Sequence, residues 1–336
     1  MKAIVTLMLL AIQALSAISY AQTAAAPEPY GIALEGYSYP YPVRLLPVVW
    51  EGRALRMAYM DVAPSVPANG RTVVLLHGRN FPGSYWAPTI AALTASGYRV
   101  VVPDQIHFGK SSKPDDLPVN FDVMAAHTAA LLDHLKIAQV DMVAHSIGGM
   151  AGTRFTRSFP ERVRKLVLEA PVGLEDYRLY VPLVPRERLI EQEMALTPEQ
   201  YYTQLMNTYN PQLTREQFWP YIEVRARTMG SAEYPRWVRS YVSSYYAMWG
   251  QPVVHEFPLI KQPTLIVVGS RDKTATGRAF APPELREHMG NFPKLAREVA
   301  ARMPNARAEV FEGHGHMLHL EAGERFHRTL LAFLAE

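Results

Sequence analysis

The stretch that decides the fold is "VDMVAHSIGGM", residues 140–150. It begins as an apolar run and ends on a histidine, a serine and two glycines. A short apolar run of this kind is typical of a strand that is covered on both faces. A serine at its end, followed by glycines at the start of a helix, predicts a sharp turn that exposes the serine hydroxyl. The pattern therefore indicates a nucleophile elbow at Ser146.

This elbow departs from the usual G-x-S-x-G pattern, because Ala144 occupies the first position. Small residues are needed around the serine because the strand and helix backbones cross closely there. Ala144 adds one methyl group, which weakens the pattern without breaking it. The alternative interpretation is that Ser146 is an ordinary helix N-cap.

Similar apolar, β-branched runs recur along the chain and alternate with segments of helical period. They cover residues 72–78, 98–104, 140–146, 163–171, 263–272 and 306–313, after an opening pair at 43–52 and 54–64. Strands that alternate with helices are typical of a mostly parallel sheet with helices on both faces. The sequence therefore predicts the α/β class.

The alternation stops between residues 174 and 258, where several helical stretches occur without a convincing strand. We interpret this segment as a helical insert in one domain. The expected organisation is a signal peptide at 1–21, an irregular N-terminal arm at 22–42, a core at 43–173 and 259–336, and the helical insert at 174–258.

The N-terminus has the composition of an export signal. Lys2 precedes the apolar run 3–18, and Ser19 and Ala21 are small residues at the positions expected for cleavage before Gln22. We expect a periplasmic or secreted mature protein, with an uncleaved membrane anchor as the alternative. No second apolar run is long enough to span a bilayer, so we expect no stable membrane insertion after cleavage.

Composition excludes several other classes. The formal net charge of +3 over 336 residues gives no reason to expect nucleic acid as a partner. The chain has no cysteine, which excludes disulfides and thiolate metal sites. At 49% hydrophobic residues, the chain has ample material for a large core without disulfides.

Chemically useful side chains follow two later strands. Asp272 comes at the end of the run beginning at 263, and His316 lies in the glycine-rich loop after the last strand. The carboxyl ends of parallel strands meet at one edge of a sheet, where sites form. With Ser146 as nucleophile, His316 is the candidate base, and Asp272 is the candidate acid that orients it.

Each assignment has rivals nearby. His314 and His319 compete with His316, and Glu175 and Asp176 compete with Asp272. We expect those two acids to be solvated, because they lie beyond the end of their strand. Three histidines in six residues could also indicate a metal site, but no further ligand at suitable spacing supports one. We therefore expect no metal and no organic cofactor.

The three candidate residues occur along the chain in the order serine, aspartate, histidine. In this order, and over residues 43–336, the chain resembles the α/β-hydrolase superfamily, in its capped, lipase-like serine-hydrolase branch. The segment 101–114, "VVPDQIHFGKSSKP", is similar to the Asp-x-x-Gly-x-Gly-x-Ser loop of that family, with His107 where glycine is usual. The resemblance implies an eight-stranded, mostly parallel sheet and a cap formed by the helical insert. It gives the 101–114 loop no chemical role.

The resemblance also implies an oxyanion hole. The letters "HGRN" at 77–80 stand where the family has its oxyanion loop, which places the backbone N–H groups of Arg79 and Ile147 at the developing charge. Supporting residues of the two loops are His77, Gly78, Ala144, His145 and Gly148. We expect a structural role for His77.

The expected function is hydrolysis of a small-molecule carboxylic ester through an acyl-enzyme on Ser146, without cofactor. A C–C bond hydrolase of the meta-cleavage type and a perhydrolase are alternatives that use the same triad. A ligand-binding protein on a hydrolase scaffold is the alternative of another class. Apolar or aromatic substrates are favoured because the insert 174–258 holds ten of the eighteen tyrosines, although most should fill its own core. Four arginines of the insert could recognise an anionic substrate, but arginines on a helical surface usually face water, and we expect that here: Arg225, Arg227, Arg236 and Arg239.

Overall fold

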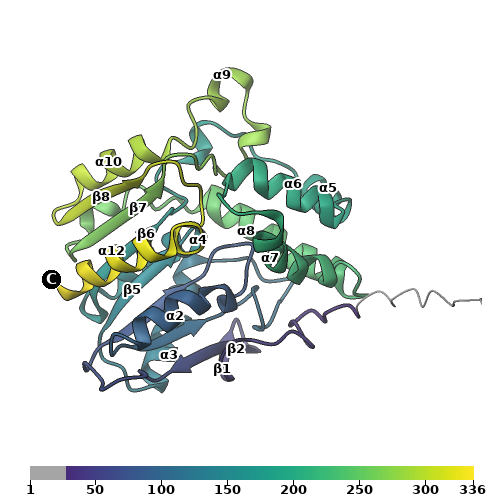
Figure 1. The fold of residues 1–336 in the computed structure, drawn as a ribbon. Helices are drawn as coiled ribbons and strands as arrows, with labels where there is room; N and C mark the ends of the chain where they lie inside the picture. Colours follow the sequence, from purple (N-terminus) through teal and green to yellow (C-terminus); the bar gives the residue numbers. More distant parts are fainter. Residues whose placement is uncertain (1–27) are drawn as a thin grey trace, which may run out of the picture.

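The computed structural model describes residues 28–336 and is built on one eight-stranded sheet (Figure 1). The strands are β1 (Val43–Trp50), β2 (Arg53–Val62), β3 (Thr72–Leu76), β4 (Arg99–Pro103), β5 (Val140–His145), β6 (Val163–Glu169), β7 (Thr264–Gly269) and β8 (Ala306–Phe311). Their order in the sheet is β1-β2-β4-β3-β5-β6-β7-β8. The β1–β2 and β2–β4 pairs are antiparallel and the other pairs are parallel. The predicted fold class is confirmed.

Helices cover both faces of the sheet, which explains why the central strands are apolar along their whole length. The helices α2 (Ala87–Thr94) and α12 (Gly323–Ala335) pack on one face. The other face is covered by α3 (Phe121–His134), α4 (Ile147–Ser158) and α10 (Phe292–Arg302). Successive side chains of a strand point to opposite faces, so Leu75 belongs to the first core and Leu76 to the second.

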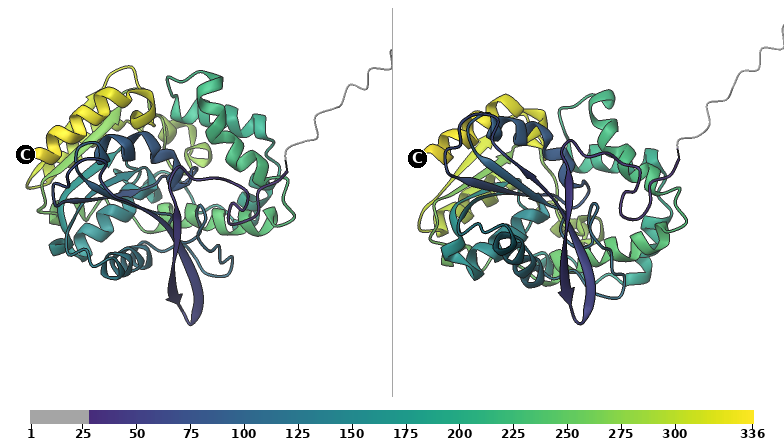
Figure 2. Two further views of the ribbon diagram at one scale, coloured as in Figure 1. Left: turned by 60° about the horizontal axis from the view of Figure 1, so that its bottom comes forward. Right: turned by 90° about the horizontal axis from the view of Figure 1, so that it is seen from below.

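Between β6 and β7 the chain forms α5 (Arg186–Met194), α6 (Pro198–Tyr209), α7 (Arg215–Thr228) and α8 (Tyr234–Gly250). We call these four helices the cap. Capping boxes begin two of them, Thr197 with Gln200 at α6 and Thr214 with Gln217 at α7. Figure 2 shows the cap, in green, to one side of the sheet.

The arm at 28–42 runs from the cap to the core (Figure 2). Arg227 of α7 donates to the hydroxyl of Tyr30 at 2.6 Å, and the hydroxyl of Tyr39 donates to a carboxylate oxygen of Asp104 at 2.5 Å. The expected signal peptide at 1–21 lies outside the described residues. Within residues 28–336, no helix has the length and apolar character needed to cross a membrane.

The loop after β4 has a structural geometry. The Asp104 carboxylate accepts hydrogen bonds from the backbone N–H groups of Gly83 and Lys110 at 2.8 and 2.7 Å. His107 has a positive φ of 83°, the conformation for which glycine is the usual residue, and its ring lies 2.8 Å from the Ser240 hydroxyl of α8. The loop therefore joins β4 to the cap.

The short helices that complete the described chain are α9 (Pro283–Arg286) and α11 (Leu318–Glu321).

Candidate active site

Ser146 lies in a strained turn between β5 and α4. Its backbone has φ 58° and ψ −121°, a conformation that non-glycine residues rarely adopt and that costs about 1–3 kcal/mol. Its side chain makes no capping hydrogen bond to α4, so the N-cap alternative does not describe it. The residue is buried and lines a cavity. This is the geometry of a nucleophile elbow.

Two glycines of α4 make this turn possible. A Cβ at Gly148 would lie 2.6 Å from the Leu76 carbonyl oxygen, so only glycine lets α4 approach β3 so closely. A Cβ at Gly152 would lie 2.9 Å from the Ala144 methyl. The methyl group that breaks the usual motif is therefore accommodated because residue 152 has no side chain.

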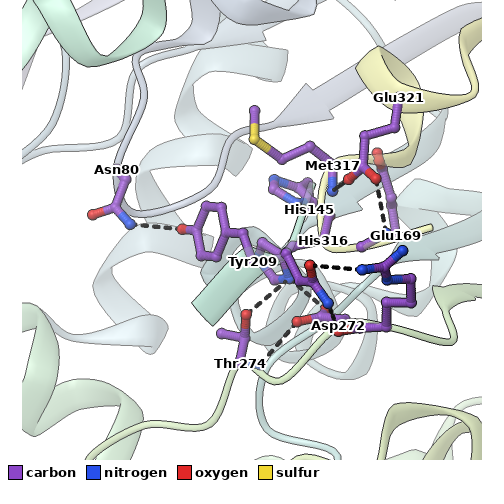
Figure 3. Close-up of polar contacts among 12 residues, drawn as sticks. Asn80, His145, Glu169, Tyr209, Asp272, Thr274, His316, Met317 and Glu321 are labelled. Atoms are coloured by element: carbon purple, nitrogen blue, oxygen red, sulfur yellow. Dashed lines mark hydrogen bonds and ion pairs between the residues drawn. The ribbon is translucent and has the colours of Figure 1, made fainter. Parts of the chain in front are cut away.

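The structure brings His316 and Asp272 together. The His316 ring Nδ1 lies 2.6 Å from Asp272 Oδ2, and both side chains are fully buried (Figure 3). The other carboxylate oxygen accepts the Thr274 backbone N–H at 2.8 Å. A His316 ring that donates from Nδ1 to Asp272 presents its other nitrogen, Nε2, as an acceptor. That Nε2 is buried and has no hydrogen-bond partner within residues 28–336.

The two rival histidines go elsewhere. His314 Nδ1 lies 2.9 Å from the Glu312 carbonyl, within its own loop. His319 Nδ1 lies 2.7 Å from Glu169 Oε1, and both groups are fully buried. In the part of the chain that the structure describes, no three or more His, Asp or Glu side chains are arranged to hold a metal.

The rival acids are also occupied, but the expectation that they are solvated was wrong. Glu175 and Asp176 are only 7% and 8% exposed. Glu175 Oε1 accepts the Gly290 backbone N–H at 2.9 Å, and burial raises the pKa of Glu175 to about 7. Asp176 pairs with Arg178 at 2.6 Å, which lowers the pKa of Asp176. The segment before α10 covers this loop, a long-range contact that local sequence does not reveal.

The buried pair of Glu169 and His319 was missed by sequence reasoning. Glu169 is the last residue of β6, and its Oε1 also accepts the His319 backbone N–H at 2.9 Å. The His319 ring packs against Trp86 with centroids 4.3 Å apart. Burial raises the pKa of Glu169 and holds the pKa of His319 well below its usual range. The available signal was a carboxylate at the end of a strand on the site edge.

His145 connects the two loops that flank Ser146. The Gly78 backbone N–H donates to the Tyr85 hydroxyl at 2.9 Å, and that hydroxyl lies 2.8 Å from His145 Nδ1. His145 Nε2 lies 3.0 Å from the His316 carbonyl oxygen. Burial holds the pKa of His145 well below its usual range, so the ring is neutral. A neutral ring with its proton on Nε2 satisfies all three contacts.

The "HGRN" loop approaches the elbow closely. A Cβ at Gly78 would lie 2.8 Å from His145 Nδ1 and 3.3 Å from the Ser146 Cβ. His77 stiffens the loop: its Nδ1 lies 2.7 Å from the Gly78 carbonyl, and its Nε2 accepts the Gln105 backbone N–H at 3.0 Å. Residue 78 therefore has to be glycine for the loop to come this close to Ser146.

The side chains of the next two residues of this loop, Arg79 and Asn80, contact the cap. Asn80 Nδ2 donates to the Tyr209 hydroxyl at 2.6 Å, and Asn80 Oδ1 accepts the Tyr241 hydroxyl at 2.5 Å. Arg79 Nε donates to the Ser244 hydroxyl at 2.7 Å. The side chains at 79 and 80 thus tie the loop to α6 and α8. This is a structural reason for "RN" where glycines are common.

A cavity of about 550 Å³ lies over Ser146, between the core and the cap. Four of the ten tyrosines of segment 174–258 line it: Tyr201, Tyr209, Tyr241 and Tyr245. Arg225 lines it too, so the expectation that this residue faces water was wrong. Arg225 is 4% exposed and pairs with Glu193 at 2.5 Å, because α7 turns this side of the helix toward α6 and α8.

Comparison with known proteins places this geometry in a family. A family model described as the alpha/beta hydrolase family matches residues 73–329. The chain belongs to the α/β-hydrolase family. Members of this family act on small-molecule substrates, and the chain is an enzyme of that family.

Among curated members of the α/β-hydrolase family, this chain is similar to two hydrolases of dienoate compounds. A 2-hydroxy-6-oxononadienedioate/2-hydroxy-6-oxononatrienedioate hydrolase of Burkholderia vietnamiensis is 27% identical over 310 residues, covering 85% of this chain and 93% of the relative. A 2-hydroxy-6-oxo-2,4-heptadienoate hydrolase of Pseudomonas putida is 27% identical over 280 residues, covering 79% and 90%.

Solved structures of α/β-hydrolases are similar over most of the chain. A probable hydrolytic enzyme from Pseudomonas aeruginosa PAO1 has a TM-score of 0.88 and 38% identity, covering 91% of this chain and 98% of that one. An esterase from Exiguobacterium antarcticum has a TM-score of 0.66 and 20% identity, covering 84% and 97%. The second likeness concerns the fold alone.

Proposed function

We propose that this α/β-hydrolase is a serine hydrolase that cleaves carboxylic esters through an acyl-enzyme on Ser146. The observation that carries the proposal is the buried contact of 2.6 Å between His316 Nδ1 and Asp272, which leaves His316 Nε2 unpaired. Ser146, in its strained turn, lines the cavity beside Thr274, the residue that holds the other Asp272 oxygen.

In the proposed reaction, His316 Nε2 takes the proton of Ser146 as the serine oxygen attacks the ester carbonyl carbon. The resulting oxyanion accepts hydrogen bonds from the backbone N–H groups of Arg79 and Ile147. His316 then gives its proton to the leaving alkoxide, and the acyl group stays on the serine. Water attacks this ester with His316 again as base, which releases the acid. Asp272 holds the imidazole and stabilises its charged form.

A C–C bond hydrolase is the second candidate, and the similarity to the two dienoate hydrolases favours it. The same serine would attack a ketone carbonyl, and the leaving group would be a carbon that takes a proton. The chain differs from the Gly-rich oxyanion loops usual in such enzymes, because Arg79 and Asn80 carry side chains that contact the cap. This difference favours the ester as the first candidate.

Two measurements test the proposal. A fluorophosphonate probe should label the wild-type protein at Ser146 and leave Ser146→Ala unlabelled, whereas a protein that only binds ligands on this scaffold should not react. Turnover should then be compared between 4-nitrophenyl esters of graded acyl length and 2-hydroxy-6-oxo-dienoates. Ester turnover that depends on Ser146 supports the first candidate. Labelling with turnover of the dienoates alone supports the second.

A further inference from the structure

Arg79 lines the cavity together with Ser146. Its Nε donates to the Ser244 hydroxyl, and its Cζ lies 3.9 Å from the centre of the Tyr241 ring. Within residues 28–336, no carboxylate pairs with Arg79, and its Nε makes its one side-chain hydrogen bond, so the two terminal nitrogens make none. A half-buried arginine of the cavity wall therefore keeps four N–H donors without a partner among the described residues.

Most of the other charged side chains that line the cavity are also positive. Among the described residues, its other basic side chains are Arg225, Lys273, Arg278 and Arg286, and its one acidic side chain is Glu193. Glu193 is already paired with Arg225. Positive charge is thus in excess around the cavity, and low-dielectric walls increase its effect on a bound anion.

We propose that the substrate carries a carboxylate and that Arg79 is the residue that selects it. The inference rests on the proposed hydrolase function and names its substrate class. The planar fork of a guanidinium matches the two oxygens of a carboxylate, and such paired, charge-assisted bonds are strong. The Tyr241 ring supports this fork, and Asn80 fixes the Tyr241 hydroxyl at 2.5 Å. The fork is therefore held in place before substrate binds.

Arg79 could instead act on the oxyanion, since its backbone N–H is proposed to do so. The two roles differ in their effect on one ratio, that of kcat/KM for a carboxylate-bearing ester to kcat/KM for its neutral counterpart. A side chain that binds a substrate carboxylate affects only substrates that have one. A side chain that stabilises the oxyanion affects charged and neutral substrates by the same factor, because both form the same oxyanion.

The experiment measures kcat/KM on matched esters at 0.15 M salt, which screens distant charges. One pair is mono-4-nitrophenyl adipate and 4-nitrophenyl hexanoate, with the charge on the acyl arm. The other is 4-carboxyphenyl hexanoate and phenyl hexanoate, with the charge on the leaving group. Rates with Ser146→Ala are subtracted as background. The variants are Arg79→Gln, Arg79→Lys and, as a control, Arg215→Gln, which alters an exposed ion pair with Glu199.

In the wild type we expect the carboxylate ester to exceed its neutral partner by about ten- to hundredfold in at least one pair, as for hydrogen bonds between charged groups. Arg79→Gln should bring that ratio close to one, Arg79→Lys should restore part of it, and Arg215→Gln should keep it. A wild-type ratio near one, or a ratio that survives Arg79→Gln, overturns the inference while leaving ester hydrolysis intact. Failure of the proposed function is distinct, because then neither ester is cleaved in a Ser146-dependent way.

Discussion

The ring of Tyr209, at the end of cap helix α6, lies against the imidazole of His316 with ring centroids 4.2 Å apart (Figure 3). The His316 backbone N–H donates to the Tyr209 carbonyl at 3.0 Å, and the Tyr209 hydroxyl accepts from Asn80. One cap residue thus contacts both the candidate base and the oxyanion loop. The cap therefore contacts both loops of the candidate site as well as covering the cavity.

Removal of this contact should reduce activity in two steps. Tyr209→Phe keeps the ring but leaves Asn80 Nδ2 without its partner, and we expect kcat/KM to fall roughly fivefold, as for one lost buried hydrogen bond. Tyr209→Ala also removes the ring from His316 and should lower kcat further. Tyr202→Phe, on the same helix but outside the cavity wall, is the control for folding and activity. Full activity in a folded Tyr209→Ala protein would contradict the positioning role.

The nucleophile assignment predicts a large effect at Ser146 and a small one two residues earlier. Ser146→Ala should lower ester turnover by several orders of magnitude without unfolding the protein. Ala144→Gly restores the usual motif and removes one methyl that already fits beside Gly152, so activity should be nearly unchanged. Retention of more than roughly a tenth of the activity by Ser146→Ala would exclude the elbow serine as nucleophile.

The acid assignment is tested by amide substitutions. Asp272→Asn offers an amide in place of the acceptor at His316 Nδ1 and should lower kcat by roughly 10³ to 10⁴. Asp176→Asn is the matched control, because Asp176 pairs with Arg178 instead of a histidine. Steady-state kinetics with circular dichroism separate lost chemistry from lost folding. Equal losses in the two variants would argue against a special role for Asp272.

The raised pKa of Glu175 should make the free energy of unfolding depend on pH. Its pKa in the folded protein is raised to about 7 from 4.5, so the folded state keeps this proton while the unfolded state releases it. Stability is therefore lost as pH rises from about 4.5 to 7. Relative to the wild type, Glu175→Gln should gain about 2–3 kcal/mol more at pH 8 than at pH 5. Urea unfolding of both proteins at the two pH values measures this, and a gain independent of pH would contradict it.

Export is predicted from residues 1–21. Fractionation of cells followed by N-terminal sequencing should find a chain that begins near Gln22 outside the cytoplasm. Such cleavage would leave Tyr30 and Tyr39 in place, and with them the contacts of the arm with Arg227 and Asp104. A soluble cytoplasmic protein that still begins at Met1 would show that the apolar run is not a signal peptide.

The sequence by itself determined the α/β class and the candidate residues at the strand ends. Both depend on local patterns: apolar runs of strand length, and polar residues directly after them. Because parallel strands end at one edge of the sheet, Ser146, Asp272 and His316 could be grouped without coordinates. The same local rules required a small residue at 148, and the structure narrows this to glycine, since a Cβ there would meet the Leu76 carbonyl oxygen.

Only the tertiary structure decided which of the neighbouring histidines contacts Asp272 and which charged side chains are buried. Three histidines in one loop look alike in sequence, but the fold buries His319 against Glu169 and His316 against Asp272. Likewise Arg225 and Glu175 resemble surface residues in the sequence, but α6 and α8 cover Arg225 and the segment before α10 covers Glu175. These outcomes depend on contacts between residues far apart in the chain. Such contacts arise from how helices pack, which local hydrophobic patterns do not specify.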